Sequence, residues 1–253
     1  MRGTFYYSLI TIWYIVTCVK VIILAGGLGT RLSEETETKP KPMVEIGGKP
    51  IIWHLMSVFA KQGLIDFVLA LGYKQEVARN WVNTFNNVDK WKIDPLDTGS
   101  ETQTGGRILK CMAKYPNQRV IVTYGDGLSN ISLKNLIDFH ESHNKIATVT
   151  AVRPPARFGH LNIEGKMVTR FGEKVQTDEG WINGGFFVLE PRVIDYIKGD
   201  LDLFETGALP KLALEGELMA YKHFGFWQPM DTLREKNELH NLAMQKCPPW
   251  LIV

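Results

Sequence analysis

The amino-acid sequence predicts an α/β fold, in which a mostly parallel sheet is flanked by helices and carries a small antiparallel elaboration. Two observations predict it. From Val19 onward, uninterrupted apolar runs typical of strands buried on both faces alternate with segments of helical periodicity. After Pro154 the pattern changes to short strands separated by turns, as in antiparallel pairing. The alternation indicates strand–helix–strand units with right-handed crossovers.

Each predicted element has its own local signal. The apolar run 21–24 ends at Gly26 and Gly27, as a buried strand does before a turn. Pro50 suits the first turn of a helix, where its fixed φ fits and no N–H is needed. The same reasoning places further strands at 67–71, 119–123 and 147–152, and helices at 75–81, 133–143, 203–214 and 232–245. Short strands at 160–165, 166–170 and 182–189 form the expected antiparallel part.

Composition excludes several classes of protein. Of the 253 residues, 45% are hydrophobic and 22% charged, which is ordinary for a soluble enzyme large enough to bury a full core. The net charge of +2 lacks the excess of Lys and Arg that a nucleic-acid-binding face needs, although it suits small anionic substrates. Cys18, Cys111 and Cys247 form no C-x-x-C pair, so a reducing cytoplasm is expected. His140 and His143 lack zinc-helix spacing, which places them at a solvated helix end.

The first eighteen residues are expected to lie outside the catalytic fold, as an extension of a single domain over 19–253. Residues 3–19 carry no charge, but they fall short of the roughly 20 residues that span a bilayer. No small-x-small cleavage site precedes Lys20, so a signal peptide is not favoured. Because Lys20 begins the first strand without a linker, a membrane helix here would press the core against lipid. A membrane partner is therefore not expected, although an anchor at 3–19 stays an alternative, as does a start site assigned too early.

A glycine-rich loop, Leu-Ala-Gly-Gly-Leu-Gly-Thr-Arg over 24–31, follows the first strand. Ligands of open α/β sheets bind at the carboxyl ends of strands, and glycines let backbone N–H groups converge on phosphate oxygens. The dinucleotide pattern G-x-G-x-x-G fails because it meets Leu32, and no G-K-[ST] tripeptide makes a P-loop. Arg31 strengthens the phosphate interpretation, since a guanidinium binds phosphate through two parallel hydrogen bonds.

A basic proline run, Lys39-Pro-Lys-Pro-Met43, comes shortly after this loop. The two prolines are expected to hold the backbone extended, so that Lys39 and Lys41 project from a stiff segment. In isolation such a run is more often a solvated surface loop. Its position behind a glycine loop favours a lysine that faces phosphate.

These two segments, L-A-G-G-L-G-T-R-L and K-P-K-P-M-V-E-I-G-G-K-P, resemble the sugar-nucleotide nucleotidylyltransferases. The runs W-Q-P-M-D-T-L-R, at 227–234, and S-E-E-T, at 33–36, are similar to the branch that acts on CTP. The resemblance extends from Val19 to about Trp250. It implies a Rossmann-like fold of the nucleotide-diphospho-sugar transferase type. It also implies transfer of a cytidylyl group from CTP to α-D-glucose 1-phosphate, giving CDP-glucose and pyrophosphate, with Mg²⁺ as cofactor and a homo-oligomer as the assembly.

The resemblance also implies roles for individual residues. Catalytic roles fall on Arg31, Lys41 and Lys174. Nucleotide contacts fall on Leu24, Ala25, Gly26, Gly27, Gly29, Thr30, Arg31, Lys41, Thr104, Gly105 and Gly125. Sugar-phosphate contacts fall on Glu173, Lys174, Asn183 and Gly184, and the metal ligands are Asp126 and Asp231. The chain departs from the family pattern at Val175, where Pro is usual, and in a shorter stretch between 73 and 97.

The chemistry explains why these residue types are needed. The attacking phosphate oxygen is already an anion, so positioning and electrostatic stabilisation must supply most of the acceleration. Mg²⁺ prefers hard oxygen ligands, which Asp126 and Asp231 offer. Taken alone, Asp126 would be a turn residue and Asp231 a helix N-cap, but together with Lys41 we favour the metal site. Two alternatives stay open at this point: the same reaction with UTP or dTTP, and a non-catalytic nucleotide-binding protein.

Overall fold

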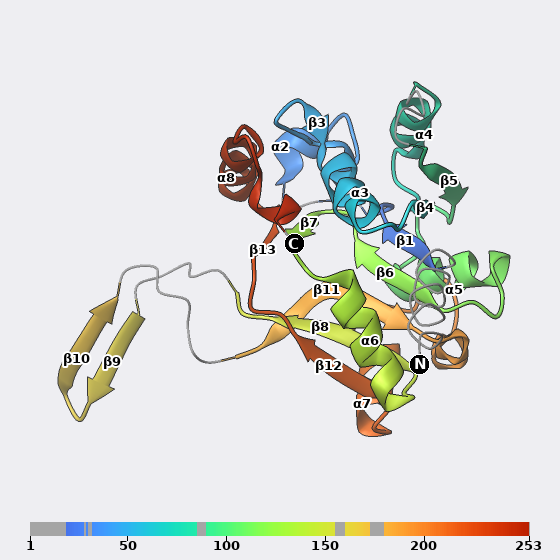
Figure 1. Ribbon diagram of the computed structural model, residues 1–253. Coiled ribbons are helices and arrows are strands. Elements are labelled where there is room, and N and C mark those ends of the chain that lie inside the picture. Colours follow the sequence, from blue (N-terminus) through green and yellow to red (C-terminus); the bar gives the residue numbers. More distant parts are fainter. Residues whose placement is uncertain are drawn as a thin grey trace, which may run out of the picture.

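The core of the fold is a seven-stranded sheet with the strand order β12-β8-β11-β6-β1-β4-β5 (Figure 1). The computed structural model describes residues 19–27, 29, 32–84, 90–154, 160–172 and 180–252. The strands are β1 (Lys20–Leu24), β4 (Asp66–Leu71), β5 (Lys92–Asp97), β6 (Val120–Tyr124), β8 (Ala147–Val152), β11 (Ile182–Leu189) and β12 (Leu218–Lys222). Together with the helices on both faces, this sheet confirms the predicted α/β fold.

The strand β11 is the exception to the parallel arrangement of this sheet. β1 pairs in parallel with both β4 and β6, and further parallel pairs join β4 to β5 and β8 to β12. β11 lies between β6 and β8 and runs antiparallel to both. The sequence predicted an antiparallel strand here, which is confirmed, but placed it in a separate elaboration, whereas it lies within the main sheet. Its residues from Gly184 to Leu189 are all buried, and only a central position covers both faces of such a strand.

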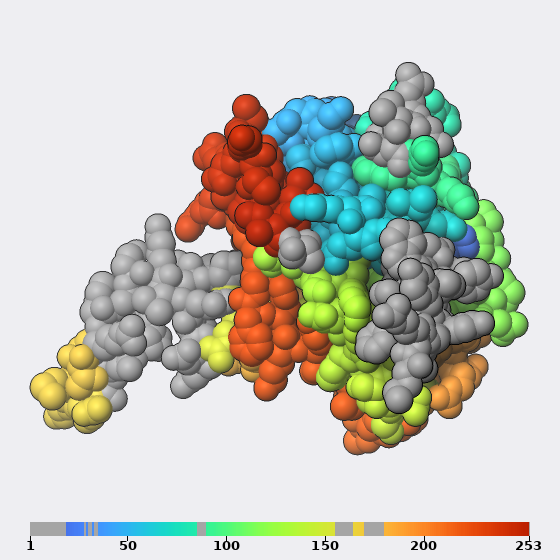
Figure 2. Space-filling model, in the orientation of Figure 1, coloured from blue at the N-terminus to red at the C-terminus, as the bar shows by residue number. Residues whose placement is uncertain are grey.

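Two hydrophobic clusters, one on each face, enclose the sheet. Successive residues of β1 alternate between them: Val21 and Ile23 belong to one cluster, and Ile22 and Leu24 to the other. The first cluster is covered by α3 (Ile51–Lys61), α4 (Gln75–Thr84), α6 (Leu133–His143) and α8 (Leu233–Ala243). The second is covered by α5 (Thr104–Lys114), η3 (Pro191–Tyr196) and α7 (Ala208–Leu214). Figure 2 shows α3, α6 and α8 spread over the first face.

Three short ribbons complete the described chain. The antiparallel elaboration is confirmed by β9 (His160–Glu164) and β10 (Met167–Gly172), a hairpin that lies apart from the main sheet in Figure 1. A second ribbon joins β7 (Gly127–Ser129) to β13 (Trp227–Pro229), and a third joins β2 (Glu45–Ile46) to β3 (Lys49–Pro50). Short helical turns are α2 (Ser33–Thr36), η2 (Lys41–Met43) and η4 (Pro249–Leu251). The expected extension, residues 1–18, lies outside the described residues. None of the helices described is both long and apolar enough to cross a membrane.

Two local predictions differ from the structure. The helix expected from 203 begins only at Ala208, because residues up to Gly207 form a turn whose backbone is bound to the start of α5. His140 of α6 does not lie at a solvated helix end, whereas His143 is the last residue of the helix and is only partly buried. His140 is 1% exposed, with Nδ1 at 2.8 Å from Thr148 Oγ1 and Nε2 at 3.1 Å from Glu190 Oε1. The polar character of histidine concealed that the sheet covers this face of the helix.

Candidate active site

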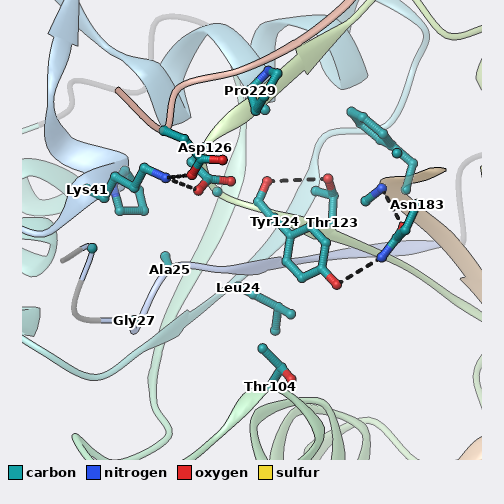
Figure 3. A pocket seen from close by; sticks show the side chains of 18 of the residues that line it. Leu24, Ala25, Gly27, Lys41, Thr104, Thr123, Tyr124, Asp126, Asn183 and Pro229 are labelled. Carbon is teal, nitrogen blue, oxygen red and sulfur yellow. Dashed lines mark hydrogen bonds and ion pairs between the residues drawn. The ribbon is translucent and has the colours of Figure 1, made fainter. Parts of the chain in front are cut away.

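A pocket of about 810 Å³ opens beside the carboxyl ends of β1 and β6 (Figure 3). The end of β1 and the turn after it supply Leu24, Ala25 and Gly26, while β6 supplies Thr123 and Tyr124. Parallel strands all present their carboxyl ends at one edge, which is where α/β proteins bind ligands. The position of the pocket therefore agrees with the expectation from the glycine loop.

A buried lysine joins two carboxylates in this pocket. Lys41 Nζ lies 2.6 Å from Asp126 Oδ2 and 2.7 Å from Asp231 Oδ1. The lysine side chain is 9% exposed, whereas the two carboxylates are 30% and 24% exposed. Burial by itself would lower the pKa of Lys41, but the two carboxylates outweigh it and raise that pKa. The ammonium group of Lys41 therefore keeps its proton at neutral pH and balances part of the charge of the two carboxylates.

A two-stranded ribbon brings the two aspartates together. β7 pairs with β13 in a register that sets Gly127 opposite Pro229, so Asp126 and Asp231 follow on at the same end. The backbone N–H of Met230 also donates to the carbonyl oxygen of Asp126 at 2.8 Å. Backbone pairing thus fixes both carboxylates, although the aspartates are far apart in the sequence.

Neither aspartate serves only the local role that its sequence position suggests. The N-cap of α8 is Thr232, whose side chain accepts from the N–H of Glu235 in a capping box. Asp231 precedes this cap, and its Oδ1 accepts from Lys41 instead. Asp126 does lie in the turn between β6 and β7, but its Oδ2 also points to Lys41. The carboxylates converge on one ammonium group, as cation ligands do.

The proline run is not extended at Lys41, contrary to the sequence prediction. Pro40 is extended, with φ −68° and ψ 151°, but Lys41–Met43 form a 3-10 turn that contains Pro42 within its first positions. Proline is tolerated there because its fixed φ fits and its missing N–H is not needed. The turn is buried, and it directs Lys41 into the pocket.

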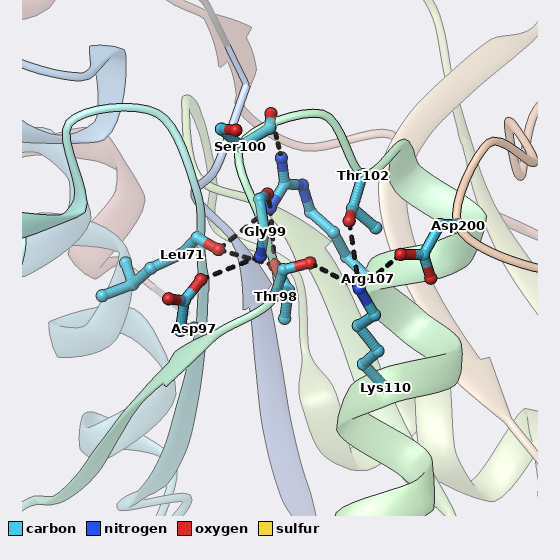
Figure 4. Close-up of polar contacts among 9 residues, drawn as sticks. All are labelled: Leu71, Asp97, Thr98, Gly99, Ser100, Thr102, Arg107, Lys110 and Asp200. Atoms are coloured by element: carbon cyan, nitrogen blue, oxygen red, sulfur yellow. Dashed lines mark hydrogen bonds and ion pairs between the residues drawn. The ribbon is translucent and has the colours of Figure 1, made fainter.

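Arg107, a buried residue of α5, holds the backbone of the glycine loop at Gly26. Figure 4 shows its guanidinium beside Leu71 and Gly99. Its Nη2 donates to the carbonyl oxygen of Gly26 at 2.9 Å, and its Nη1 donates to those of Leu71 and Gly99, both at 2.9 Å. A Cβ at position 26 would lie 2.2 Å from Arg107 Nη1, so only glycine fits beside the guanidinium. Burial lowers the pKa of Arg107, and the carbonyl oxygens stabilise its charge in place of a carboxylate.

The opposite wall of the pocket combines Tyr124, Asn183 and Trp227. Asn183 Nδ2 donates to the hydroxyl of Tyr124 at 3.3 Å, and Trp227 Nε1 donates to the carbonyl oxygen of Gly184 at 2.7 Å. Gly185 has φ +79°, and a Cβ there would lie 2.5 Å from the ring of Tyr124. This wall is polar on strands that are otherwise apolar, which marks it as a binding surface.

Most of the residues singled out from the sequence lie together in the pocket. Those lining it are Leu24, Ala25, Gly26, Gly27, Gly29, Lys41, Thr104, Gly125, Asp126, Asn183, Gly184 and Asp231. Gly105 is not part of the described lining, because its N–H donates to the carbonyl oxygen of Asp202 at 2.9 Å. Thr30, Arg31, Glu173 and Lys174 lie outside the described residues.

Sequence reasoning did not assign Arg107 or Tyr124 to the pocket, and it left Trp227 open between a substrate-stacking residue and a core residue. Trp227 was as easily interpreted as a core residue, since tryptophan serves both purposes. Tyr124 carried a usable signal, because it ends a buried strand two residues before Asp126. Arg107 also carried one, since a charged residue within the apolar face of a helix must be satisfied by something buried.

The sequence of this chain is similar to those of known proteins. The family described as nucleotidyl transferase matches residues 20–232. The chain belongs to the nucleotidyl transferase family. This nucleotidyl transferase is 46% identical over 254 residues to glucose-1-phosphate cytidylyltransferase of Salmonella typhi, covering 92% of this chain and 98% of that protein. It is 41% identical to the probable glucose-1-phosphate cytidylyltransferase of Bacillus subtilis, covering 92% and 100%.

The fold of this nucleotidyl transferase is also similar to solved structures. The crystal structure of HddC from Yersinia pseudotuberculosis complexed with GMP-PN aligns with a TM-score of 0.69 and 29% identity. The alignment covers 88% of this chain and 98% of that one. The resemblance inferred from the glycine loop and the proline run is therefore confirmed by matches along most of the chain.

Proposed function

We propose that this nucleotidyl transferase is a glucose-1-phosphate cytidylyltransferase, which joins CTP to α-D-glucose 1-phosphate and releases pyrophosphate. One observation carries the type of reaction: the Lys41 ammonium lies between Asp126 and Asp231 in a pocket lined by the glycine loop. The identities of 46% and 41% to two proteins named for this activity support the choice of CTP and glucose 1-phosphate.

In this reaction an oxygen of glucose 1-phosphate attacks the α-phosphorus of CTP. The bond from that phosphorus to the bridging oxygen breaks, and pyrophosphate leaves with the bonding electrons. Because the nucleophile is already anionic, no side chain has to remove a proton. The barrier comes from bringing several negative charges together, so Lys41 and the backbone of the glycine loop act by position and charge.

The carboxylates fit a divalent cation. Asp126 Oδ2 and Asp231 Oδ1 converge on one point, since both lie within 2.7 Å of the same nitrogen. The described residues offer no cluster of three or more acidic, histidine or cysteine ligands, and Mg²⁺ typically takes one or two carboxylates with water and phosphate oxygens. Asp126 and Asp231 would hold Mg²⁺, which when bound offsets the charge of the reacting phosphates.

The remaining roles in the proposal come from the resemblance. Thr30 and Arg31 contact the triphosphate, and Glu173 and Lys174 contact the sugar phosphate. Residues 1–18 form an extension outside a single domain at 19–253. The enzyme works in the reducing cytoplasm as a homo-oligomer, which light scattering after size-exclusion chromatography would test.

The proposed reaction is tested by supplying the purified protein with glucose 1-phosphate and each nucleoside triphosphate in turn, and measuring pyrophosphate release. We expect release with CTP well above that with UTP, dTTP or ATP. Equal or faster release with UTP or dTTP would refute the choice of base and leave the reaction type intact. Release with none of them, together with measurable nucleotide binding, would favour the non-catalytic alternative.

A further inference from the structure

The carboxylate of Glu205 joins two side chains that line the pocket. Tyr124 donates its hydroxyl proton to Glu205 Oε1 at 2.5 Å, and Thr104 donates its hydroxyl proton to Oε2 at 2.6 Å. Tyr124 and Thr104 both line the pocket, whereas Glu205 is not part of its described lining. Glu205 therefore lies behind the wall and fixes one hydroxyl group with each of its oxygens.

The loop that carries Glu205 is itself held in place. Phe204 is 1% exposed, and its N–H donates to Thr104 Oγ1 at 2.9 Å. The N–H of Gly105 donates to the carbonyl oxygen of Asp202 at 2.9 Å. A Cβ on Gly105 would lie 2.6 Å from that oxygen, so glycine permits the close approach of this loop to α5. The position of Glu205 is thus set by backbone contacts on both sides.

The hydrogen bonds of the two hydroxyl groups can be counted. Tyr124 donates its only hydroxyl proton to Glu205 and accepts a hydrogen bond from Asn183 Nδ2 at 3.3 Å. Thr104 donates its only hydroxyl proton to Glu205 and accepts a hydrogen bond from the N–H of Phe204. A hydroxyl has one proton and two lone pairs, so each oxygen has only acceptor capacity left for a ligand.

The hydroxyl group of Tyr124 is oriented by its own hydrogen bond. It donates to Glu205 Oε1 at 2.5 Å, and a carboxylate oxygen only accepts. The amide of Asn183 is oriented as well, because its Oδ1 accepts from the N–H of Gly185 at 2.8 Å. The donor and acceptor pattern of this wall is therefore fixed before any ligand binds.

We propose that Glu205 is a positioning residue that makes Tyr124 and Thr104 acceptors for sugar hydroxyl groups and directs phosphate away from this wall. This role replaces the nucleotide contact that the resemblance implied for Thr104. Sugar hydroxyls carry protons to donate, whereas ionised phosphate oxygens carry none and meet only lone pairs on these two residues. The inference rests on the proposed function, which puts a sugar phosphate in the pocket. In Figure 3 Asn183 lies across the pocket from Lys41 and Gly27, which leaves the phosphates on the opposite side.

The substitution Glu205→Gln tests this role. Glutamine keeps the shape but offers one oxygen and one NH₂ group, so one of the two hydroxyls must accept from it and turn its own proton elsewhere. We expect the KM for glucose 1-phosphate to rise about five- to tenfold, the effect of one lost hydrogen bond, with the KM for CTP changed less than threefold. Tyr124→Phe should show the same split. The double variant should be no worse than the worse single variant, because both changes break one chain of bonds.

The matched control is the pair formed by Tyr196 and Glu215. Tyr196 donates to Glu215 Oε2 at 2.5 Å in an exposed position that does not line the described pocket. Glu215→Gln and Tyr196→Phe make the same chemical changes there, and they should leave both KM values unchanged.

Deoxy analogues of glucose 1-phosphate give a readout that a purely structural role would not move. One deoxy analogue lacks the sugar hydroxyl that donates to this wall. The affinity that the wild-type protein loses with this analogue should equal the affinity that Glu205→Gln loses with glucose 1-phosphate itself. The variant should then no longer distinguish the two substrates. If the variant binds glucose 1-phosphate and this deoxy analogue equally well, Glu205 acts on that sugar hydroxyl.

Three results would overturn the proposal: unchanged KM values in Glu205→Gln, equal rises for both substrates with a lowered Tm, or full discrimination of every deoxy analogue. If the wild-type protein prefers another nucleotide or sugar phosphate, the proposed function fails and the same comparison is made with the preferred pair. A failure of the role proposed for Glu205 can therefore be distinguished from a failure of the proposed function.

Discussion

Arg107 donates through Nη2 to the carbonyl oxygen of Gly26 at 2.9 Å, so a residue of α5 holds the backbone of the glycine loop. The same guanidinium binds the carbonyl oxygens of Leu71, at the end of β4, and Gly99, after β5. One side chain thus joins the ends of three neighbouring strands on the floor of the pocket. The backbone at Gly26 is therefore held in place before an anion binds beside it.

We expect Arg107→Lys to destabilise the protein and to raise the KM for CTP. Lysine offers a single ammonium and leaves several buried carbonyl oxygens without a donor. The expected loss in the free energy of unfolding is about 2–4 kcal/mol, measured by urea denaturation. The control is Arg234→Lys, where a side chain that is 61% exposed pairs with Glu238, and where we expect less than about 0.5 kcal/mol. Equal effects at the two sites would contradict the role given to Arg107.

Asp126→Asn and Asp231→Asn should each lower kcat by about 10² or more, a loss of roughly 2.7 kcal/mol in transition-state stabilisation. Asparagine keeps the shape but removes an anionic oxygen from the proposed metal site. Because the two carboxylates act on one ion, the double variant should be little worse than the worse single variant. The measurement is the single-turnover rate at saturating CTP over a range of Mg²⁺ concentrations.

The same variants should have a lower Tm, since each removes one of the two carboxylates bound to Lys41. Asp138→Asn is the matched control, because Asp138 makes an exposed pair with Lys134 on α6. Near wild-type rates in either Asp126 or Asp231 variant, or losses that simply multiply in the double variant, would refute the shared site.

The free energy of unfolding should fall as the pH is lowered below about 6.5. Burial lowers the pKa of His140 from 6.5, and the Arg119 charge adds to this, although the neighbouring Glu190 acts in the opposite direction. The unfolded chain therefore binds a proton that the folded protein does not, so stability declines with falling pH until the folded pKa is reached. Burial lowers the pKa of His143 as well, so it adds to the slope. One such group contributes at most about 1.4 kcal/mol per pH unit.

The measurement is urea denaturation at intervals between pH 7.5 and pH 5. His140→Asn should flatten the slope, whatever it does to stability at pH 7.5, because the titrating group is gone. An unchanged slope in His140→Asn would show that other groups cause the acid sensitivity.

A protein that begins at Val19 should fold and react as the full chain does. Val19 is 6% exposed and belongs to a core cluster, and Lys20 starts β1, so such a chain keeps the first core element. Circular dichroism, Tm and pyrophosphate release would check this. Insoluble protein after the truncation would show that residues 1–18 contribute to folding.

The parts of the fold that the sequence predicted are those with a strong local signal. β1 reads as a strand because apolar residues fill both of its faces, and α3 begins where Pro50 indicates. β11 has the same apolar character, but no local pattern says whether such a strand lies in the main sheet or outside it. Its position is decided by pairing with β6 and β8, which is a property of the whole chain.

The residues of the candidate site also divide into those that a sequence motif marks and those that no motif marks. Lys41, Asp126 and Asp231 were found because their motifs are conspicuous, and the structure places both carboxylates within hydrogen-bond distance of the Lys41 ammonium group. Glu205 had no motif, since a single glutamate in a polar turn looks like any surface residue. Its contacts with Tyr124 and Thr104 depend on tertiary packing, which the sequence pattern does not encode locally.

The ribbon of β7 and β13 has a consequence for the order in which a newly made chain becomes active. Synthesis proceeds from the N-terminus at about 5–20 residues per second, and Lys41 and Asp126 emerge long before Asp231. Until β13 is released from the ribosome, β7 lacks its partner and Lys41 lacks its second carboxylate. Trp250, which is buried in the core, emerges later still. Translation products that stop before this point contain the glycine loop but not the complete site, so catalytic activity reports a finished chain.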